Sequence, residues 1–396
     1  MGISTPSTLI RTTPSRINSH GRGTAGMEFL VVAGSLLWLA LLLVPWRPWS
    51  TRERLEPTGE SAGSLSDLTV VIPARNEADV IQRTLSALGK QGMDLRVILV
   101  DDQSSDETTF LATSALRIGL QVIKGETLPS GWTGKLWALE QGWRNSRTEL
   151  VLLLDADIEL ENGMIDMLRQ RLIGEKLDLV SIMAHLRMES FWEKLLAPAF
   201  IYFFKLLYPF SIGNNPNSNF GVAAGGCMLV RSDTLRKIGG FQSIRNAIID
   251  DCSLADGVKK IGGRTWIGLS HSVRSHRPYP RLANFCEMVE RTAFTQLRYS
   301  IWLLLATTFI LLLAFWLPVV GLFSSSLPVR WFALAGVNAM MASYLPTLRY
   351  YRRSALWALA LPLIGGLYLF MTWSSALRFW RGKRSEWKGR VYVRNS

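Results

Sequence analysis

The sequence is poor in the residues that build structural metal sites and disulfide frameworks. Its 396 residues include only three cysteines and four histidines. Cys227, Cys252 and Cys286 lie far apart and have no paired spacing, whereas zinc ligands and disulfide frameworks follow recurring spacings. The sequence therefore predicts neither kind of site, and its few cysteines suit a reducing compartment.

Charge is absent from four long stretches of the chain. These are 29–46, 301–329, 331–348 and 354–377. A membrane-spanning helix needs roughly 17–25 predominantly apolar residues. We expect a transmembrane anchor at 29–46 and two to three spans in a C-terminal region at 299–377. The stretch that contains Asn338 and Pro346 is the weakest of these candidates.

The first apolar stretch has an alternative interpretation as a cleaved signal peptide. Arginines precede it in the segment 1–28, which we expect to be flexible. However, no small-residue cleavage site follows, because the next residues are Pro45-Trp-Arg-Pro-Trp49. We therefore interpret 29–46 as an uncleaved anchor whose tryptophans suit a membrane interface. Residues 47–67 are predicted to be a linker.

Basic residues outnumber acidic ones by 44 to 31, for a formal net charge of +13. They gather beside the apolar stretches, at 264–298 and in the tail 378–396. Such clusters mark the cytoplasmic side of a membrane and attract anionic lipid. The charge therefore predicts the lipid bilayer as a partner and no nucleic acid. We expect a multi-pass protein of the cell membrane whose central domain faces the cytoplasm.

This orientation conflicts with three C-terminal spans. Three spans would carry the basic tail 378–396 to the outside, although a basic tail favours the inside. One C-terminal stretch is therefore expected to be re-entrant or interfacial, and the sequence leaves open which one.

Short apolar runs alternate with segments of helical spacing between the apolar stretches. The runs lie at 68–72, 96–100, 120–123, 149–154 and 178–182, and the helical segments at 77–89, 105–118, 134–145 and 162–173. Apolar runs of this length suit parallel strands covered on both faces. The alternation predicts an α/β fold with a mostly parallel sheet and helices on both faces.

Polar clusters follow three of these predicted strands. They are Pro73-Ala-Arg-Asn-Glu77, Asp101-Asp-Gln-Ser-Ser-Asp106 and Asp155-Ala-Asp157. Ligands of open α/β sheets bind beyond the carboxyl ends of the strands, so we expect the clusters to line one crevice. An acidic pair after a strand is often only a helix N-cap, which remains the alternative for each cluster alone.

The third cluster has the pattern of a cation site. Residues two apart in an extended segment point the same way, so Asp155 and Asp157 are predicted to hold Mg²⁺ or Mn²⁺ with open positions for phosphate oxygens. Such a cation neutralises charge on a departing diphosphate. The alternative is a solvated acidic turn, which the preceding leucine run disfavours.

In combination these motifs strongly resemble those of family 2 glycosyltransferases with the GT-A fold. The resemblance rests on the three clusters, on Gly131-Trp-Thr-Gly-Lys135 and on Ile249-Asp-Asp-Cys-Ser-Leu-Ala255. The membrane arrangement is similar to the subgroup that acts on lipids: ceramide, carotenoid and hopene-associated glycosyltransferases. The hopene-associated type is the most similar, on Gly131 to Ala138, Phe294-Thr-Gln-Leu-Arg-Tyr-Ser300 and Trp387-Lys-Gly-Arg390. The resemblance covers about 68–300 and implies a catalytic domain at 68–298.

The resemblance implies a donor site for a UDP-sugar. The implied nucleotide-sugar-binding residues are Pro73, Arg75, Glu77, Asp101, Asp102, Lys135, Asp155 and Asp250. Lys135 is expected to offset diphosphate charge, unless it is only a surface lysine. Asp157, with Asp155, is the implied metal ligand.

Asp250 and Asp251 align with an acidic pair whose second carboxylate is the general base of this family. The chemistry needs one base, because the acceptor hydroxyl loses its proton as it attacks the anomeric carbon. We therefore expect Asp251 to be catalytic. Asp250 has an alternative role as the cap of a helix predicted at about 252–261.

The sequence departs from the family in Thr295-Gln-Leu-Arg298-Tyr299, where processive members carry Gln-x-x-Arg-Trp. This departure disfavours polymer synthesis. Arg298 is expected either to contact the diphosphate or to anchor the chain at the membrane surface. The aromatic segment 190–212 is expected to be an interfacial helix that guides a lipid acceptor, with a buried core helix as its alternative.

The leading hypothesis is an inverting, metal-dependent transferase that moves a sugar from a UDP-sugar to a membrane lipid, hopanoid-like or other. One alternative keeps the reaction but changes the acceptor to polyprenyl phosphate or a polysaccharide. A non-enzymatic alternative is a membrane scaffold or transporter with a degenerate nucleotide-binding domain, which the retained acidic clusters disfavour.

Overall fold

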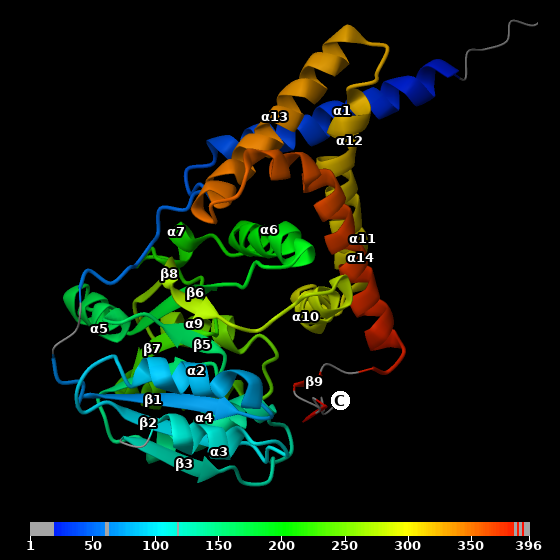
Figure 1. The fold of residues 1–396 in the computed structure, drawn as a ribbon. Helices are drawn as coiled ribbons and strands as arrows, with labels where there is room; N and C mark the ends of the chain where they lie inside the picture. The colour runs from blue at the N-terminus through cyan, green and yellow to red at the C-terminus, as the bar shows by residue number, and fades with distance from the viewer. Residues whose placement is uncertain (1–19, 60–62, 117–118, 384–385, 388–389, 392–396) are drawn as a thin grey trace, which may run out of the picture.

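The computed structural model describes residues 20–59, 63–116, 119–383, 386–387 and 390–391. Of the segment 1–28, which was expected to be flexible, residues 1–19 lie outside the described residues, whereas 20–28 belong to a helix that begins at His20. Parts of the linker (60–62) and of the basic tail (384–385, 388–389 and 392–396) also lie outside the described residues. The chain folds into a sheet-based domain from which a group of long helices extends (Figure 1).

Eight strands form the main sheet. They are β1 (Leu68–Ala74), β2 (Arg96–Asp101), β3 (Leu120–Lys124), β4 (Leu150–Leu154), β5 (Ile158–Leu160), β6 (Leu179–His185), β7 (Cys227–Arg231) and β8 (Thr265–Ser275). Their order is β3-β2-β1-β4-β7-β6-β8-β5. A small separate sheet pairs β9 (Glu386–Trp387) with β10 (Arg390–Val391).

The helices of the sheet domain are α2 (Ala78–Leu88), α3 (Thr108–Ala115), α4 (Gly134–Asn145), α5 (Met164–Gly174), α7 (Phe210–Gly213), α8 (Ser232–Lys237), η1 (Phe241–Ile244) and α9 (Asp250–Lys260). The remaining helices are α1 (His20–Leu43), α6 (Phe191–Leu207), α10 (Leu282–Gln296), α11 (Ile301–Leu311), η2 (Leu312–Trp316), α12 (Leu317–Gly321), α13 (Leu327–Tyr350), η3 (Ala355–Ala360) and α14 (Leu361–Trp380).

Strands β3, β2, β1 and β4 are mutually parallel, as predicted. Beyond β4 the sheet changes direction, because β7 runs antiparallel to both β4 and β6. Strands β5, β7 and β8 were not predicted from the sequence. In β8 the sequence Ser270-His-Ser-Val-Arg-Ser275 interrupts the apolar run with polar residues, so the pattern of a covered strand is lost.

Strand β1 is longer than the sequence predicted. Pro73 was expected to follow this strand, at the nucleotide site, but it lies inside the strand. Pro73 is buried inside the strand, opposite Val100 of β2. A proline lacks the backbone N–H needed for a second ladder. The pairing of β1 with β4 ends at Val71, so at Pro73 the strand pairs only with β2 and no hydrogen bond to β4 is lost.

Three helical stretches are long and apolar enough to cross a membrane, namely Gly26–Leu43, Ile301–Gly321 and Ala355–Trp380. Helix α13 has 24 residues but is not apolar enough to count among these stretches; its polar residues include Asn338 and the buried Ser343. Figure 1 shows α13 crossing α1 at the end of the molecule away from the sheet. The described residues thus contain two C-terminal candidate spans, Ile301–Gly321 and Ala355–Trp380. The sequence predicted two to three.

Helix α6 connects the sheet domain with the long helices. Its Tyr202 hydroxyl lies 2.6 Å from Ser343 Oγ of α13, and Tyr368 of α14 donates a hydrogen bond to the Leu196 carbonyl. Phe191 and Leu207, at its two ends, are exposed apolar side chains. The helix thus has a covered middle and open ends, and its placement at a membrane surface stays a prediction.

The contact between α4 and β1 gives a test of the packing. A Cβ at Gly142 of α4 would lie 2.3 Å from Val71 Cγ1, and a valine cannot move its methyl groups far. We expect Gly142→Ala to lower the free energy of unfolding by about 1–3 kcal/mol, measured by urea denaturation of the purified protein. Gly174→Ala at the end of α5 is the control, because no atom lies within 4 Å of its added Cβ. Equal effects of the two substitutions would contradict the packing.

Candidate active site

A first polar cluster joins the ends of β1 and β2. The Arg75 guanidinium donates hydrogen bonds to the backbone carbonyls of Asp102 and Gln103 and lies 3.9 Å from Asp102 Oδ2. Asp102 is buried, and Asp101 Oδ1 accepts a hydrogen bond from the Ser104 amide. The loop after β2 is therefore held against the loop after β1, as expected for two strand ends that form one edge.

A second cluster is built on Arg277, which follows β8. One nitrogen of its guanidinium, Nη2, lies 2.8 Å from Glu77 Oε1 and 3.2 Å from Asp157 Oδ1. The other oxygen of Asp157 accepts a hydrogen bond from Ser275 Oγ at 2.5 Å. Glu77 and Asp157 are both nearly inaccessible to solvent. A single cation thus draws together carboxylates that follow β1 and β4.

The sequence did not identify Arg277 as a site residue. It stood among the basic residues assigned to the membrane surface, because β8 was not predicted and its carboxyl end could not be read. A strand end at Ser275 would have been the signal that places Arg277 beside the other clusters.

A third cluster surrounds Lys135 in the first turn of α4. Thr133 caps this helix by accepting a hydrogen bond from the Leu136 amide. Lys135 Nζ lies 3.0 Å from Asp155 Oδ1 and 3.2 Å from Asp250 Oδ2. The side chain is therefore turned inward between two carboxylates and is not the surface lysine of the alternative interpretation.

The charge of Lys135 is fixed by its neighbours. Burial alone would lower the pKa of Lys135, but the carboxylates of Asp155, Asp250 and Asp251 raise it well above its usual range. A buried cation surrounded by anions keeps its proton because the charged form is the one that its partners stabilise. Lys135 thus stays positively charged across the physiological pH range.

Asp251 lies in the first turn of α9, which begins at Asp250 and not at the predicted 252. Asp250 is therefore inside the helix, and the residue at the N-cap is Ile249. Asp251 Oδ2 accepts a hydrogen bond from the Gly225 amide at 2.9 Å, and Oδ1 accepts one from the Cys252 amide at 2.7 Å. Burial, and then the charge of Asp250, raise the pKa of Asp251 to about 6.

Gly225 is a second site residue that the sequence did not identify, because a glycine has no side chain that indicates chemistry. A Cβ at Gly225 would lie 3.3 Å from both Asp251 Oδ2 and Lys135 Nζ. The missing side chain therefore lets the backbone approach the acidic pair closely.

The segment Asp155-Ala-Asp157 takes part in the second and third clusters, and the loop after β1 carries both Arg75 of the first cluster and Glu77 of the second. Asp155 contacts Lys135, and Asp157 contacts Arg277. The predicted site residues that the structure brings together are Arg75, Glu77, Asp101, Asp102, Lys135, Asp155, Asp157, Asp250 and Asp251.

Arg298 is not brought to these clusters. It follows α10 with an exposed side chain and a φ of 50°. No ion pair or hydrogen bond links its side chain to any of the clustered carboxylates in the described parts of the chain. In this conformation the position suits an anchor at the membrane surface better than a contact with a diphosphate.

The carboxylates of Asp155 and Asp157 are the residues that could hold a divalent cation. Within the described ranges, no three Asp, Glu, His or Cys side chains are arranged as a complete metal site. Both oxygens of Asp157 already accept hydrogen bonds, whereas the Asp155 side chain is one-third exposed. Two carboxylates fit Mg²⁺ or Mn²⁺ when phosphate and water complete the shell, and Asp155 is the more open of the two.

Loss of the Lys135 charge tests the third cluster. We expect Lys135→Met to lower the free energy of unfolding by about 2–3 kcal/mol, less than for a fully buried pair, because the carboxylates lose their shared cation but keep some solvent. Urea denaturation would measure the change. Lys260→Met, at an exposed position of α9, is the control and should have little effect. A Lys135→Met protein as stable as the control would mean that the carboxylates do not depend on this cation.

Comparisons with known proteins bear on the family and the fold of the chain. Residues 69–239 match the sequence profile of Glycosyl transferase family 2. The 4,4'-diaponeurosporenoate glycosyltransferase of Staphylococcus haemolyticus is 34% identical over 106 residues, which are 26% of this chain and 27% of that protein. The enzyme of the same name from Staphylococcus aureus is 32% identical over 129 residues, 32% of this chain and 34% of that protein. The chain thus spans about a third of the length of these relatives.

One solved structure is similar to this chain over most of the length of both proteins. The mannosyltransferase PcManGT from Pyrobaculum calidifontis, solved in complex with GDP-Man and Mn²⁺, matches 89% of this chain and 99% of its own with a TM-score of 0.55. At 19% sequence identity the similarity shows the fold alone. The sheet order, the strand-end clusters and the matched profile together show that residues 69–239 form a glycosyl transferase family 2 domain with a GT-A-like fold.

Proposed function

We propose that the protein is an inverting glycosyltransferase that moves a sugar from a UDP-sugar to a lipid of the membrane in which it is anchored. The observation that carries this proposal is the half-buried arrangement of Asp251 beside Lys135 and Asp155. It combines a basic carboxylate with a fixed positive charge at one edge of the sheet.

Asp251 is proposed to remove the proton of the acceptor hydroxyl. Oδ2 is oriented by the Gly225 amide, and a pKa of about 6 leaves most of the carboxylate ionised at neutral pH while it is still able to accept a proton. Attack from the face opposite the leaving nucleotide is a single displacement and inverts the anomeric carbon.

Lys135 and the Asp155–Asp157 segment are proposed to face the diphosphate of the donor. The charge of Lys135 opposes the negative charge that develops as the sugar–phosphate bond breaks. Asp155 and Asp157 would hold Mg²⁺ or Mn²⁺, which when bound supplies further positive charge to the departing diphosphate. The presence of Mn²⁺ in the complex of the similar mannosyltransferase supports this part of the proposal.

The membrane arrangement supports a lipid acceptor and a cytoplasmic catalytic domain. Two candidate spans follow the domain, and two crossings return the chain to the side from which it started. The basic residues from Arg378 onward would therefore lie on the domain side, which removes the conflict that three spans would create. Basic residues favour the cytoplasmic side. A hopanoid-like lipid and a carotenoid acid, the latter suggested by the names of the relatives, are the two acceptor classes that we propose to test.

The role of Asp251 can be tested by transfer from donor to lipid. Full-length protein would be incubated with Mn²⁺, membrane lipid extract and a panel of UDP-sugars, with GDP-mannose tested separately as an alternative donor. Nucleotide release and glycolipid formation would be measured. Asp251→Asn should lower turnover by at least about 100-fold and leave nucleotide binding unchanged, because only the base is lost.

Asp233→Asn on α8 is the matched control, because Asp233 is exposed and its ion pair is with Arg236 of its own helix and not with a residue of the clusters. The result also distinguishes acceptor classes. A hydroxyl acceptor needs a base, whereas a lipid carboxylate is already ionised near neutral pH and does not. Near-normal turnover of Asp251→Asn with a hydroxyl acceptor would rule out this residue as the base.

The pH dependence of kcat/KM gives an independent test. Protonation inactivates a general base, so kcat/KM should fall about tenfold for each pH unit below about 6, where Asp251 gains its proton. Lys135 lowers the pKa of Asp251, so in a Lys135→Met protein with measurable activity the fall should begin at a higher pH. A kcat/KM that stays constant down to pH 5 would contradict the assignment.

A further inference from the structure

A hollow lies away from the carboxylate clusters, where the chain leaves α1 and meets the end of α13. It has a volume of about 460 Å³ and is lined by Trp49, Ser50, Thr51, Arg52, Arg54 and Pro346. None of the clustered carboxylates lines it. The donor site therefore does not explain the basic residues that gather here.

The position of the hollow along the chain corresponds to the headgroup level of a bilayer. The apolar window of α1 ends at Leu43, and the lining residues of the hollow other than Pro346 follow shortly after it, from Trp49 to Arg54. Trp46 is exposed, and the Trp49 indole donates a hydrogen bond to the Leu41 carbonyl of α1. Tryptophans at the end of an apolar helix mark the membrane–water interface.

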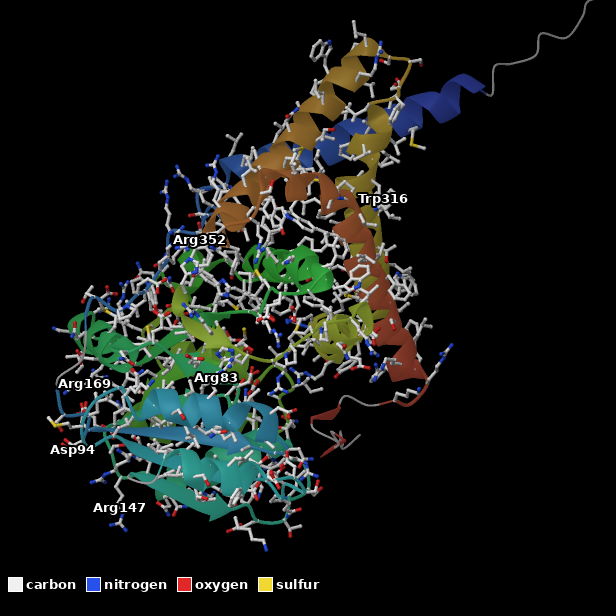
Figure 2. All side chains as sticks on the ribbon, viewed as in Figure 1. Arg83, Asp94, Arg147, Arg169, Trp316 and Arg352 are labelled. Atoms are coloured by element: carbon white, nitrogen blue, oxygen red, sulfur yellow. The ribbon has the colours of Figure 1, made fainter. Side chains whose placement is uncertain are left out.

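The hollow carries positive charge that its own surroundings do not neutralise. Arg52 is exposed, and its side chain has no ion pair or hydrogen bond with any described residue. The Arg54 guanidinium is fixed by hydrogen bonds to Thr51, at 2.6 Å to the carbonyl and 3.0 Å to Oγ1, and lies over the ring of Tyr350. Arg352 is exposed at the foot of α13 (Figure 2).

The acidic side chains nearby are engaged elsewhere. Glu53 lies 3.8 Å from the ammonium group of the buried Lys205. Glu56 accepts hydrogen bonds from Ser270, the His271 amide and Ser272. The guanidinium groups at the hollow therefore face solvent without a carboxylate partner in the described part of the chain.

A buried hydroxyl in the same hollow lacks a partner. Ser50 is 5% exposed, and its Oγ makes no hydrogen bond to any residue that the structure describes. Buried polar groups normally have a partner, because an unsatisfied one is costly. A phosphate oxygen in the hollow would accept a hydrogen bond from this hydroxyl.

We propose that the hollow binds the phosphate of an anionic phospholipid from the leaflet on the domain side. Arg52 and Arg54 would contact the phosphate oxygens, since guanidinium groups match phosphate geometry, and Ser50 Oγ would donate a hydrogen bond. The acyl chains would lie along the apolar surface of α1, whose Leu43 side chain is 83% exposed. The proposal rests on the membrane placement of the proposed function and not on its transfer reaction.

Lipid binding by the full-length, delipidated protein in detergent tests this proposal. Native mass spectrometry would measure binding of phosphatidylglycerol and of phosphatidylcholine, with millimolar inorganic phosphate as competitor. Phosphatidylglycerol should bind at least about fivefold more tightly than phosphatidylcholine, and Arg52→Gln should weaken its binding about fivefold, the effect of one arginine at an anionic lipid. Because Arg52 has no side-chain partner, this substitution should not disturb the fold. Ser50→Ala and Arg54→Gln should weaken the same binding.

The control is Arg96→Gln with Arg147→Gln, at a hollow of about 430 Å³ near the amino ends of β2 and β3. Figure 2 shows Arg147 at the end of the sheet domain far from Arg352. General attraction between a basic protein and an anionic lipid would be weakened equally at both hollows. Equal loss in the control, no preference between the lipids, or complete displacement by inorganic phosphate would each overturn the proposal. Binding is measured without donor or transfer, so the outcome is independent of the proposed reaction.

Discussion

The ion pairs of Lys135 and Arg277 are the interactions on which the site depends. Carboxylates at one sheet edge repel one another and lose hydration as they are buried, so they stay together only where cations lie between them. Lys135 holds Asp155 and Asp250, and Arg277 holds Glu77 and Asp157. Because Asp155 and Asp157 are two residues apart, the two cations and their carboxylates form one connected unit.

The fold supplies the parts of this unit from segments that are distant in sequence. The parallel strands β1, β2 and β4 end at the same edge, which delivers Glu77, Asp102 and the Asp155–Asp157 segment. The reversal of direction at β7 brings the Gly225 amide to this edge, and α9 adds Asp251. Helices α6 and α10 contact α14, and so connect the sheet domain to the apolar helices.

Much of this arrangement could be predicted from the sequence, for identifiable reasons. Continuous apolar runs indicated β1 to β4, and helical spacing gave the bounds of α4 as 134–145, which the structure has as well. Acidic residues directly after such runs are visible in a sequence, so Asp155, Asp157 and Asp102 could be selected. The aligned pair at 250–251 needed the family resemblance, because no strand precedes it.

The residues that were missed depend on contacts that a sequence does not display. Arg277 is identified by the end of β8, whose polar residues hid the strand, and Gly225 is identified only by its distance to Asp251. Pro73 was placed after a strand that in fact continues past it. Arg298 was selected from a motif, but in the described parts of the chain the clustered carboxylates pair with Arg75, Lys135 and Arg277 and not with Arg298.

The most direct test of the account is an experimental structure of the full-length protein with UDP and Mn²⁺. The account predicts that the diphosphate lies at the carboxyl ends of β1 and β4, next to Asp155 and within hydrogen-bond distance of Lys135 Nζ. Nucleotide bound at the amino ends of the strands, in the hollow lined by Arg96 and Arg147, with the Lys135 ion pairs undisturbed, would contradict it.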